Sequence, residues 1–163
     1  MKLIRLALFS VLTLFVIASF IGILLPSNAL VSRAVNITAP KDSIFPYIIN
    51  IEQWKQWMDG MQQASVTIHS TNSADLAGTA VTITGISDST VVSSWKTKTG
   101  KLQISTVRLI GDSSQKITVV QWQFEQKLKW YPWERLGSML NDKILGTMME
   151  KNLNNLKILV EKK

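Results

Sequence analysis

The sequence predicts an α+β protein in which a curved antiparallel sheet wraps around a long C-terminal helix. Two short helices follow the first strand, and a transmembrane helix precedes the domain. Three observations predict this class: an uncharged run over residues 6–25, short alternating segments in the middle, and apolar residues three and four apart over residues 145–160. A sheet and a helix that each have one apolar surface bury those surfaces against each other.

The run over residues 6–25, LALFSVLTLFVIASFIGILL, is long enough for a helix that spans the hydrocarbon core of a bilayer. Lys2 and Arg5 precede the run, which favours a cytoplasmic N-terminus. Ser27 and Ala29 are spaced as at a signal-peptidase site, so a cleaved signal peptide is the alternative. The run exceeds the apolar stretch of about 7–15 residues that signal peptides carry, which favours an uncleaved anchor.

We therefore expect a transmembrane or signal-anchor helix over residues 1–26, a linker over 27–30 and one domain over 31–163. The expected location is the cell membrane, single-pass, with the C-terminal domain periplasmic or extracellular, or secretion if the N-terminus is cleaved. The absence of cysteine excludes disulfides, thiolate metal sites and a cysteine nucleophile.

The charge of the expected exported part is modest. Without Lys2 and Arg5 it keeps 16 basic against 11 acidic residues, a net charge of +5. The charges are spread along the chain, which fits weak attraction to an anionic membrane surface better than binding to nucleic acid. The sequence leaves the oligomeric state open.

A strand over residues 29–38 opens the domain. A helix that begins near Asp42 and carries Pro46 follows, and a second short helix has Trp54 and Trp57 on one face. One face of the strand is apolar except for an arginine; it carries Val31, Arg33, Val35 and Ile37.

Five further strands are expected from alternating Thr, Val, Ser and Ile residues, with Asn72-Ser73-Ala74-Asp75 as one of the turns between them. This spacing implies an antiparallel meander. The last strand has an apolar face and a wet face. The strands are expected at residues 63–71, 77–85, 89–98, 101–111 and 115–128, and the apolar face of the last one carries Thr118, Val120, Trp122, Phe124 and Gln126.

After Pro132 the pattern becomes helical, with apolar residues at 4-4-3-4 spacing. Gly146 lies within this helix, where the missing side chain permits close approach to the sheet. A sheet that grips such a helix often leaves an apolar cavity between the two. The apolar positions of the helix are Leu145, Met149, Leu153, Leu156 and Val160.

Three segments carry a family resemblance: SRAVNITAPKDSIFPYIINIEQWKQW, ITVVQWQFEQ and DKILGTMMEKNLNNLKILVE. Their order and spacing resemble the START-like (SRPBCC) superfamily, which includes the birch-pollen allergens and the polyketide cyclase/dehydrase-type proteins. The resemblance covers residues 31–161, and it departs at Pro46 and in the polar middle strands. It implies a helix-grip fold around a hydrophobic cavity that serves lipid or small-molecule binding, and less often catalysis.

The candidate cavity residues are those expected to face one another across the sheet and the helix, and an ordinary packed core is the alternative for them. Arg108 falls in phase with Leu102, Ile104 and Ile110. It would bind an acidic head group inside a cavity, or else lie at the sheet edge with its charge in water. The candidates are Trp95, Arg108, Trp122, Phe124, Leu145, Met148, Met149 and Leu153.

The stretch KLKWYPWERL, residues 127–136, mixes rings with positive charge. We interpret it mainly as a corner between the last strand and the long helix. The alternatives for Trp130, Tyr131 and Trp133 are the rim of a cavity or contact with the membrane interface.

No catalytic residue, metal ligand or cofactor site is predicted. His69 is the only histidine, and without cysteines or a second histidine it cannot build a usual zinc site. The favoured function is therefore membrane-tethered binding of a lipid or another small hydrophobic molecule, in a cavity between the sheet and the C-terminal helix. A cyclase/dehydrase-type enzyme, or a structural or interaction domain with a filled core, is the alternative.

Overall fold

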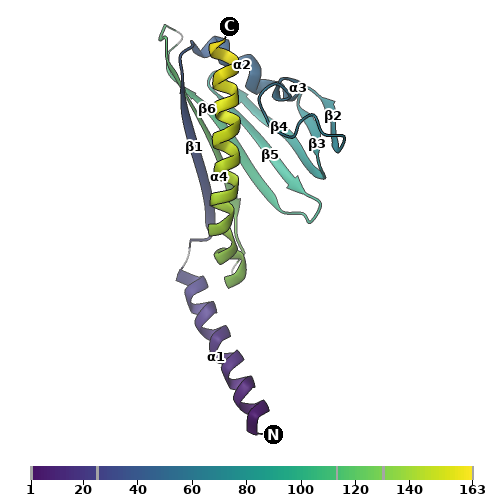
Figure 1. Ribbon diagram of the computed structural model, residues 1–163, viewed down its shortest axis with the longest axis vertical. Coiled ribbons are helices and arrows are strands. Elements are labelled where there is room, and N and C mark those ends of the chain that lie inside the picture. Colours follow the sequence, from purple (N-terminus) through teal and green to yellow (C-terminus); the bar gives the residue numbers. More distant parts are fainter. Residues whose placement is uncertain (1, 25, 113, 130, 163) are drawn as a thin grey trace.

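The structure is a computed structural model that describes residues 2–24, 26–112, 114–129 and 131–162, apart from the side chains of residues 23, 132, 136 and 139–141. One curved antiparallel sheet carries the long helix α4 along one face, next to β1 (Figure 1). The elements are α1 (Lys2–Leu24), β1 (Asn28–Ile37), α2 (Lys41–Ile49), α3 (Ile51–Trp54), β2 (Val66–Ser70), β3 (Ser73–Leu76), β4 (Thr79–Ser87), β5 (Thr90–Thr97), β6 (Leu102–Ile110), β7 (Thr118–Lys127) and α4 (Pro132–Glu161).

The predicted α+β class is confirmed. The sheet has the order β1-β7-β6-β5-β4-β3-β2, and each neighbouring pair is antiparallel. Residues paired across strands point to the same side, so the pairs of Val31 with Phe124 and of Phe124 with Ser105 belong to the inner face. The inner face predicted for the last strand is also confirmed, because all of its members are buried: Thr118, Val120, Trp122, Phe124 and Gln126.

One predicted turn is wrong. The residues 72–75, expected to connect two strands, include the start of β3, so the sheet has seven strands instead of six. Ala74 of β3 is buried, which accounts for its place in the sheet. Two tight turns flank β3: Thr71 and Asn72 connect it to β2, and Ala77 and Gly78, both with positive φ, connect it to β4, where the Gly78 N–H donates to Asp75 Oδ1 at 2.6 Å. Asparagine, serine and aspartate favour turns, but only Asn72 lies in one; Ser73 and Asp75 belong to β3.

The two short helices are tied together by indole groups. The last carbonyls of a helix lack partners within it, and α2 ends at Ile49. Trp54 Nε1 donates to the Ile48 carbonyl at 3.1 Å, and Trp57 Nε1 donates to the Tyr47 carbonyl at 3.0 Å. The rings of Trp54 and Trp57 are therefore held over the inner face of the sheet by the end of α2.

Helix α4 buries the predicted stripe, of which Met149, Leu153, Leu156 and Val160 are all core residues. Arg33, the polar exception on β1, lies on this inner side and is half-buried beside α4. Its Nε donates to Glu150 Oε1 at 2.6 Å, and its Nη1 lies 3.8 Å from Asp142 Oδ1. The arginine thus reaches across to acidic residues on the flank of the helix.

Helix α1 projects away from the domain at the end of the sheet where β1 begins and β7 ends (Figure 1). We call this the α1 end. Residues 2–22 form a helix long and apolar enough to cross a membrane, and its most apolar stretch is not buried against the domain. Such a helix near the N-terminus is typical of a signal anchor and of a signal peptide alike.

Candidate hydrophobic site

Five aromatic rings on the inner face of the sheet form a closed circuit. Trp54 stacks on Trp95 with centroids 6.2 Å apart, and Trp95 meets Phe124 edge-on at 5.2 Å. Phe124 lies 5.4 Å from Trp122, which meets Trp57 at 5.8 Å. Trp57 closes the circuit with Trp54 at 6.3 Å. Edge-to-face and offset contacts of this kind are the favoured geometries of aromatic pairs. We call this set the aromatic ring cluster.

The floor of the cluster is polar. Trp95 Nε1 donates to Ser93 Oγ at 3.0 Å, and Trp122 Nε1 donates to Ser105 Oγ at 2.8 Å. Both serines are buried on neighbouring strands, and they pair with each other across β5 and β6. Each of the four indole N–H groups therefore has an acceptor, as buried polar groups require.

A small void lies under the cluster, with a volume of about 10 Å³. That is at the lower limit for a single water molecule, so the aromatic side chains fill nearly all of the space. The void lies between the sheet and the α2–α3 region. The cavity was expected between the sheet and α4, so its expected position is corrected. Its lining has no titratable side chain: Ile48, Trp54, Trp57, Met58, Val91, Ser93, Trp95, Ser105, Val107 and Trp122.

The candidate residues fall into three groups. Trp95 and Trp122 line the void, and Phe124 belongs to the aromatic ring cluster beside it. Met149 and Leu153 are buried on α4, and Leu145 is half-buried against the core, but none of them lines the void.

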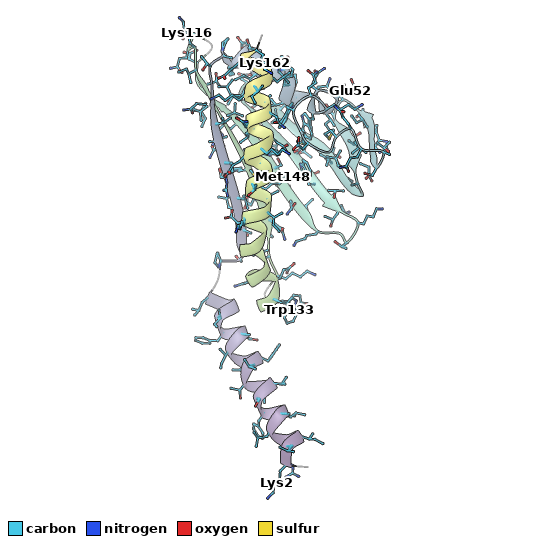
Figure 2. The ribbon with its side chains drawn as sticks, viewed as in Figure 1. Lys2, Glu52, Lys116, Trp133, Met148 and Lys162 are labelled. Carbon is cyan, nitrogen blue, oxygen red and sulfur yellow. The ribbon has the colours of Figure 1, made fainter. Side chains whose placement is uncertain are left out.

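The structure moves two candidates out of the interior. Arg108 is exposed on the outer face of the sheet, because β6 turns Val107 and Leu109 inward. Met148, halfway along α4, is 39% exposed (Figure 2). The expectation that Met148 faces the interior is therefore wrong, whereas for Arg108 the structure shows the alternative, a charge in water. Both β6 faces carry apolar residues, so its phase was ambiguous until β7 paired Trp122 with Val107.

Sequence reasoning placed Gln126 on this inner face without predicting its unpaired donor, and it missed Asn152. Gln126 is 5% exposed, and its Oε1 accepts from Gln103 Nε2 at 2.8 Å, while its own Nε2 has no partner among the described residues. Asn152 of α4 is fully buried; its Oδ1 accepts from the Asp59 N–H, and its Nδ2 has no partner in the part of the chain that the structure describes. The signal for Gln126 was its place in phase with Trp122 and Phe124, which predicts burial but not the unpaired donor.

A segment from α3 and the following turns covers the cluster, and we call residues 50–61 the cover segment. Polar contacts join it to α4: Asn155 Nδ2 donates to the Trp57 carbonyl at 3.1 Å, and Lys151 Nζ lies 2.7 Å from Asp59 Oδ2. The hydrogen bond and charge of Lys151 hold the pKa of Asp59 below its ordinary value. Together with the bond from the Asp59 N–H to Asn152, these contacts fasten the cover segment to the helix.

Charged groups of the described residues lie away from the void. No group of three or more His, Asp or Glu residues within that part of the chain is placed to hold a metal ion. His69 is exposed on β2. The Glu161 carboxylate, whose pKa is lowered by the hydrogen bond from the Thr38 N–H, lies at the far end of α4.

The stretch over residues 127–136 forms a corner fixed to the end of α1. Arg135 donates from Nη1 to the Gly22 carbonyl at 2.5 Å and from Nε to the Lys129 carbonyl at 3.3 Å. Tyr131 and Trp133 stack with centroids 5.1 Å apart, and Trp133 is 62% exposed at the start of α4 (Figure 2). The predicted strand-to-helix corner is confirmed, while Trp130 lies outside the described residues.

Comparison with solved structures identifies the architecture. A START superfamily protein from Mycobacterium smegmatis aligns with a TM-score of 0.63 and 13% identity, over 82% of this chain and 97% of that one. CalU16 from Micromonospora echinospora aligns with a TM-score of 0.56 and 14% identity, over 82% of both chains. The di-domain ARO/CYC protein StfQ from the steffimycin biosynthetic pathway aligns at 0.63 and 9% identity, over 83% of this chain and 51% of that one. No family model and no curated protein matches the sequence.

Proposed function

We propose that this chain, which has the START-type helix-grip fold, is a membrane-tethered protein that binds a lipid or another small hydrophobic molecule. The aromatic ring cluster is the proposed binding surface. The molecule would occupy the space that Trp54 and Trp57 fill in this conformation, after the cover segment has moved outward. The chain would be held at the membrane by the apolar helix α1.

The observation that carries this proposal is the polar floor beneath the aromatic rings. Burial of a hydroxyl or amide is costly unless a partner is present, and a core that only fills space is better built from apolar residues. Ser93 and Ser105 instead line the void. Gln126, on the same face of β7 but outside that lining, has an amide donor without a partner among the described residues. Apolar walls with a few polar groups are typical of sites for small molecules.

Entry of a ligand by outward movement of the cover segment is supported by the contacts that hold this segment. Its polar fastening to α4 comprises hydrogen bonds with the buried Asn152 and with Asn155, and one exposed ion pair with Lys151, beside the apolar side chains that the segment buries. Exposed ion pairs contribute little to stability, about 0–1 kcal/mol each. Loops that admit ligands are drawn from the less stable parts of a protein. The same rings, Trp54 and Trp57, would then pack on the bound molecule.

The lining of the void favours binding over a cyclase-type reaction. Acid–base catalysis needs a titratable group within hydrogen-bond reach of the reacting atoms, and the ten residues that line the void include none. The enzymatic alternative is supported by the names of structural neighbours such as StfQ, an ARO/CYC protein.

A second candidate function, a structural or interaction domain with a filled core, is favoured by the small volume of the void. Native mass spectrometry of the full chain purified in mild detergent, with organic extraction, separates the two. A bound apolar molecule, together with a rise in melting temperature on adding laurate, palmitate, oleate or phosphatidylcholine, is the expected result. Neither a bound molecule nor any thermal shift would leave the filled-core domain as the function.

A further inference from the structure

A second candidate binding site, a pocket, lies at the α1 end on the outer side of the sheet. A pocket of about 670 Å³ opens there between the β5–β6 turn, the end of β7 and the start of α4. It is separate from the void under the aromatic ring cluster, with which it shares no residue. It is lined by Thr99, Gly100, Lys101, Leu102, Ile104, Glu125, Lys127, Lys129 and Glu134.

The position of this pocket relative to α1 follows from the corner contacts. Arg135 binds both the Gly22 carbonyl and the Lys129 carbonyl, so the wall of the pocket is tied to the last turns of α1. The Leu128 N–H also donates to the Ser27 carbonyl at 2.8 Å. When α1 spans a bilayer, its apolar residues end here, and the pocket lies at the level of the phospholipid headgroups.

The lining combines positive charge with an apolar floor. Lys127 and Lys129 are exposed and Lys101 is half-buried, while Leu102 and Ile104 supply apolar surface between them. Two carboxylates, Glu125 and Glu134, share the pocket, so three lysines against two acids leave its lining with a net charge of +1. Glu134 Oε2 accepts a hydrogen bond from the Lys129 backbone N–H at 2.9 Å. Three ammonium groups beside apolar surface suit a ligand with an anionic head and an apolar tail.

The rings next to the pocket suit the same environment. Tyr131 and Trp133 are stacked nearly parallel, at 5°, and Lys129 Nζ lies 5.9 Å from the centre of the Tyr131 ring. Tryptophan and tyrosine are enriched at the membrane–water interface, where one end of the side chain is apolar and the other is wet. An exposed Trp133 beside exposed lysines is therefore expected to enter the headgroup layer.

We propose that this pocket binds the phosphate headgroup of an anionic phospholipid of the bilayer that holds α1. Lys101, Lys127 and Lys129 contact the phosphate, Leu102 and Ile104 contact the upper acyl chain, and the Tyr131–Trp133 pair rests in the interface. The bound lipid orients the domain so that the α1 end faces the bilayer. This inference rests on the tethering by α1 in the proposed function, and it is independent of any molecule in the aromatic ring cluster.

The test uses the full chain in bilayer nanodiscs of phosphatidylcholine alone or mixed with phosphatidylglycerol of matched acyl chains. Native mass spectrometry after release from the discs counts the lipids that stay bound. The test variant is K101Q/K127Q/K129Q. The matched control is K41Q/K116Q/K162Q, which removes the same charge from the other end of the domain, where Lys116 and Lys162 lie (Figure 2).

Wild type and the control variant are expected to retain phosphatidylglycerol over phosphatidylcholine by several-fold, a preference that weakens with salt. The test variant is expected to lose the preference while its far-ultraviolet circular dichroism stays unchanged. Equal retention of the two lipids by wild type, or an unchanged preference in the test variant, would overturn the inference.

Failure of the tethering gives a different result. Extraction of membranes with alkaline carbonate shows whether wild type stays in the bilayer. Release into the supernatant would overturn both the tether and the headgroup pocket, whereas retention without lipid preference overturns the pocket alone. Apolar molecules bound in the aromatic ring cluster are scored separately, by their mass and by the same variants, which leave that cluster intact.

Discussion

The guanidinium of Arg33 occupies the space beside Gly146 that any larger side chain at position 146 would need. A Cβ built on Gly146 would lie 2.6 Å from Arg33 Cζ, closer than real Cβ contacts come. The glycine lets the arginine pass along the flank of α4 and reach Glu150. The ion pair between Arg33 and Glu150 therefore depends on the absence of a side chain at position 146.

We predict that Gly146→Ala does not raise the stability of the protein, because the gain of about 0.5–1 kcal/mol that alanine brings to a helix is offset by the loss of the contact between Arg33 and Glu150. The added methyl group displaces the Arg33 guanidinium from Glu150. Gly137→Ala in the same helix is the control, because a Cβ there meets nothing within 4 Å. It is expected to stabilise α4 by about 0.5–1 kcal/mol. Urea unfolding of the full chain in mild detergent measures both. A higher urea midpoint for Gly146→Ala would contradict the predicted collision.

Adding Arg33→Ala to Gly146→Ala sharpens this test. If the collision with the guanidinium is the cause, the second substitution removes most of the penalty that offsets the gain from alanine. The coupling energy of the double-mutant cycle is then expected to be about 0.5–3 kcal/mol. Additive effects of the two substitutions would mean that the effect of Gly146→Ala does not come from a collision with Arg33.

The aromatic ring cluster is expected to be the most sensitive part of the core. Trp122→Ala should cost about 3–5 kcal/mol, since it removes a buried ring and leaves Ser105 Oγ without its indole donor. Trp133→Ala is the matched control because its ring is exposed, and a change within about 0.5 kcal/mol is expected. Thermal unfolding followed by circular dichroism compares the two. Similar losses would mean that the exposed ring is structural.

The floor of the cluster can be tested with two neighbouring serines that face opposite sides of β5. Ser93 is buried in the lining of the void, and Ser94 points to the outer face. Ser93→Val narrows the void and removes a hydroxyl, so the rise in melting temperature caused by palmitate or oleate should fall by half or more. Ser94→Val should leave that rise unchanged. Equal rises in the two variants would argue against binding at this floor.

The fastening of the cover segment is expected to resist acid until well below neutral pH. The Lys151 ammonium holds the pKa of Asp59 below its ordinary value of 3.8. A carboxylate with a depressed pKa stabilises the folded state above the unfolded pKa, and this stability is lost as pH falls through the folded pKa. The contribution of Asp59 is therefore constant near neutral pH and disappears only below about pH 3.8.

Asp59→Asn is the variant that isolates this effect. The difference in urea midpoint between wild type and Asp59→Asn should be flat near neutral pH and should shrink in strong acid. Glu161→Gln is the reference variant, because Glu161 is the other carboxyl with a lowered pKa, held down mainly by the hydrogen bond from the Thr38 N–H. A difference that grows as the pH falls would contradict the assigned ion pair.

Some parts of this architecture could be read in the sequence because each pattern had one solution. In β7 the rings of Trp122 and Phe124 alternate with Gln121 and Gln123, so only one face can be buried. In α4 the stripe from Met149 to Val160 has the period of a helix. The position of Gly146 also predicted close approach to the sheet, although the partner, Arg33, could not be named.

Other parts depended on contacts between residues far apart in the chain. Strand β6 has apolar residues on both faces, and its pairing with β7 turned Val107 inward and left Arg108 outside. The size of the interior also lay beyond any local pattern, because it depends on how Trp54 and Trp57 are placed over Trp95 and Trp122.

Periodicity therefore settled the class of fold, the order of its elements and the faces that must be buried, because burial of apolar surface acts on each segment separately. The register of the strands, the volume left under the rings and the unpaired amide of Gln126 arose from packing between segments. Those are the features on which the proposed binding depends, because the positions of the indole rings decide whether the space beneath them is filled.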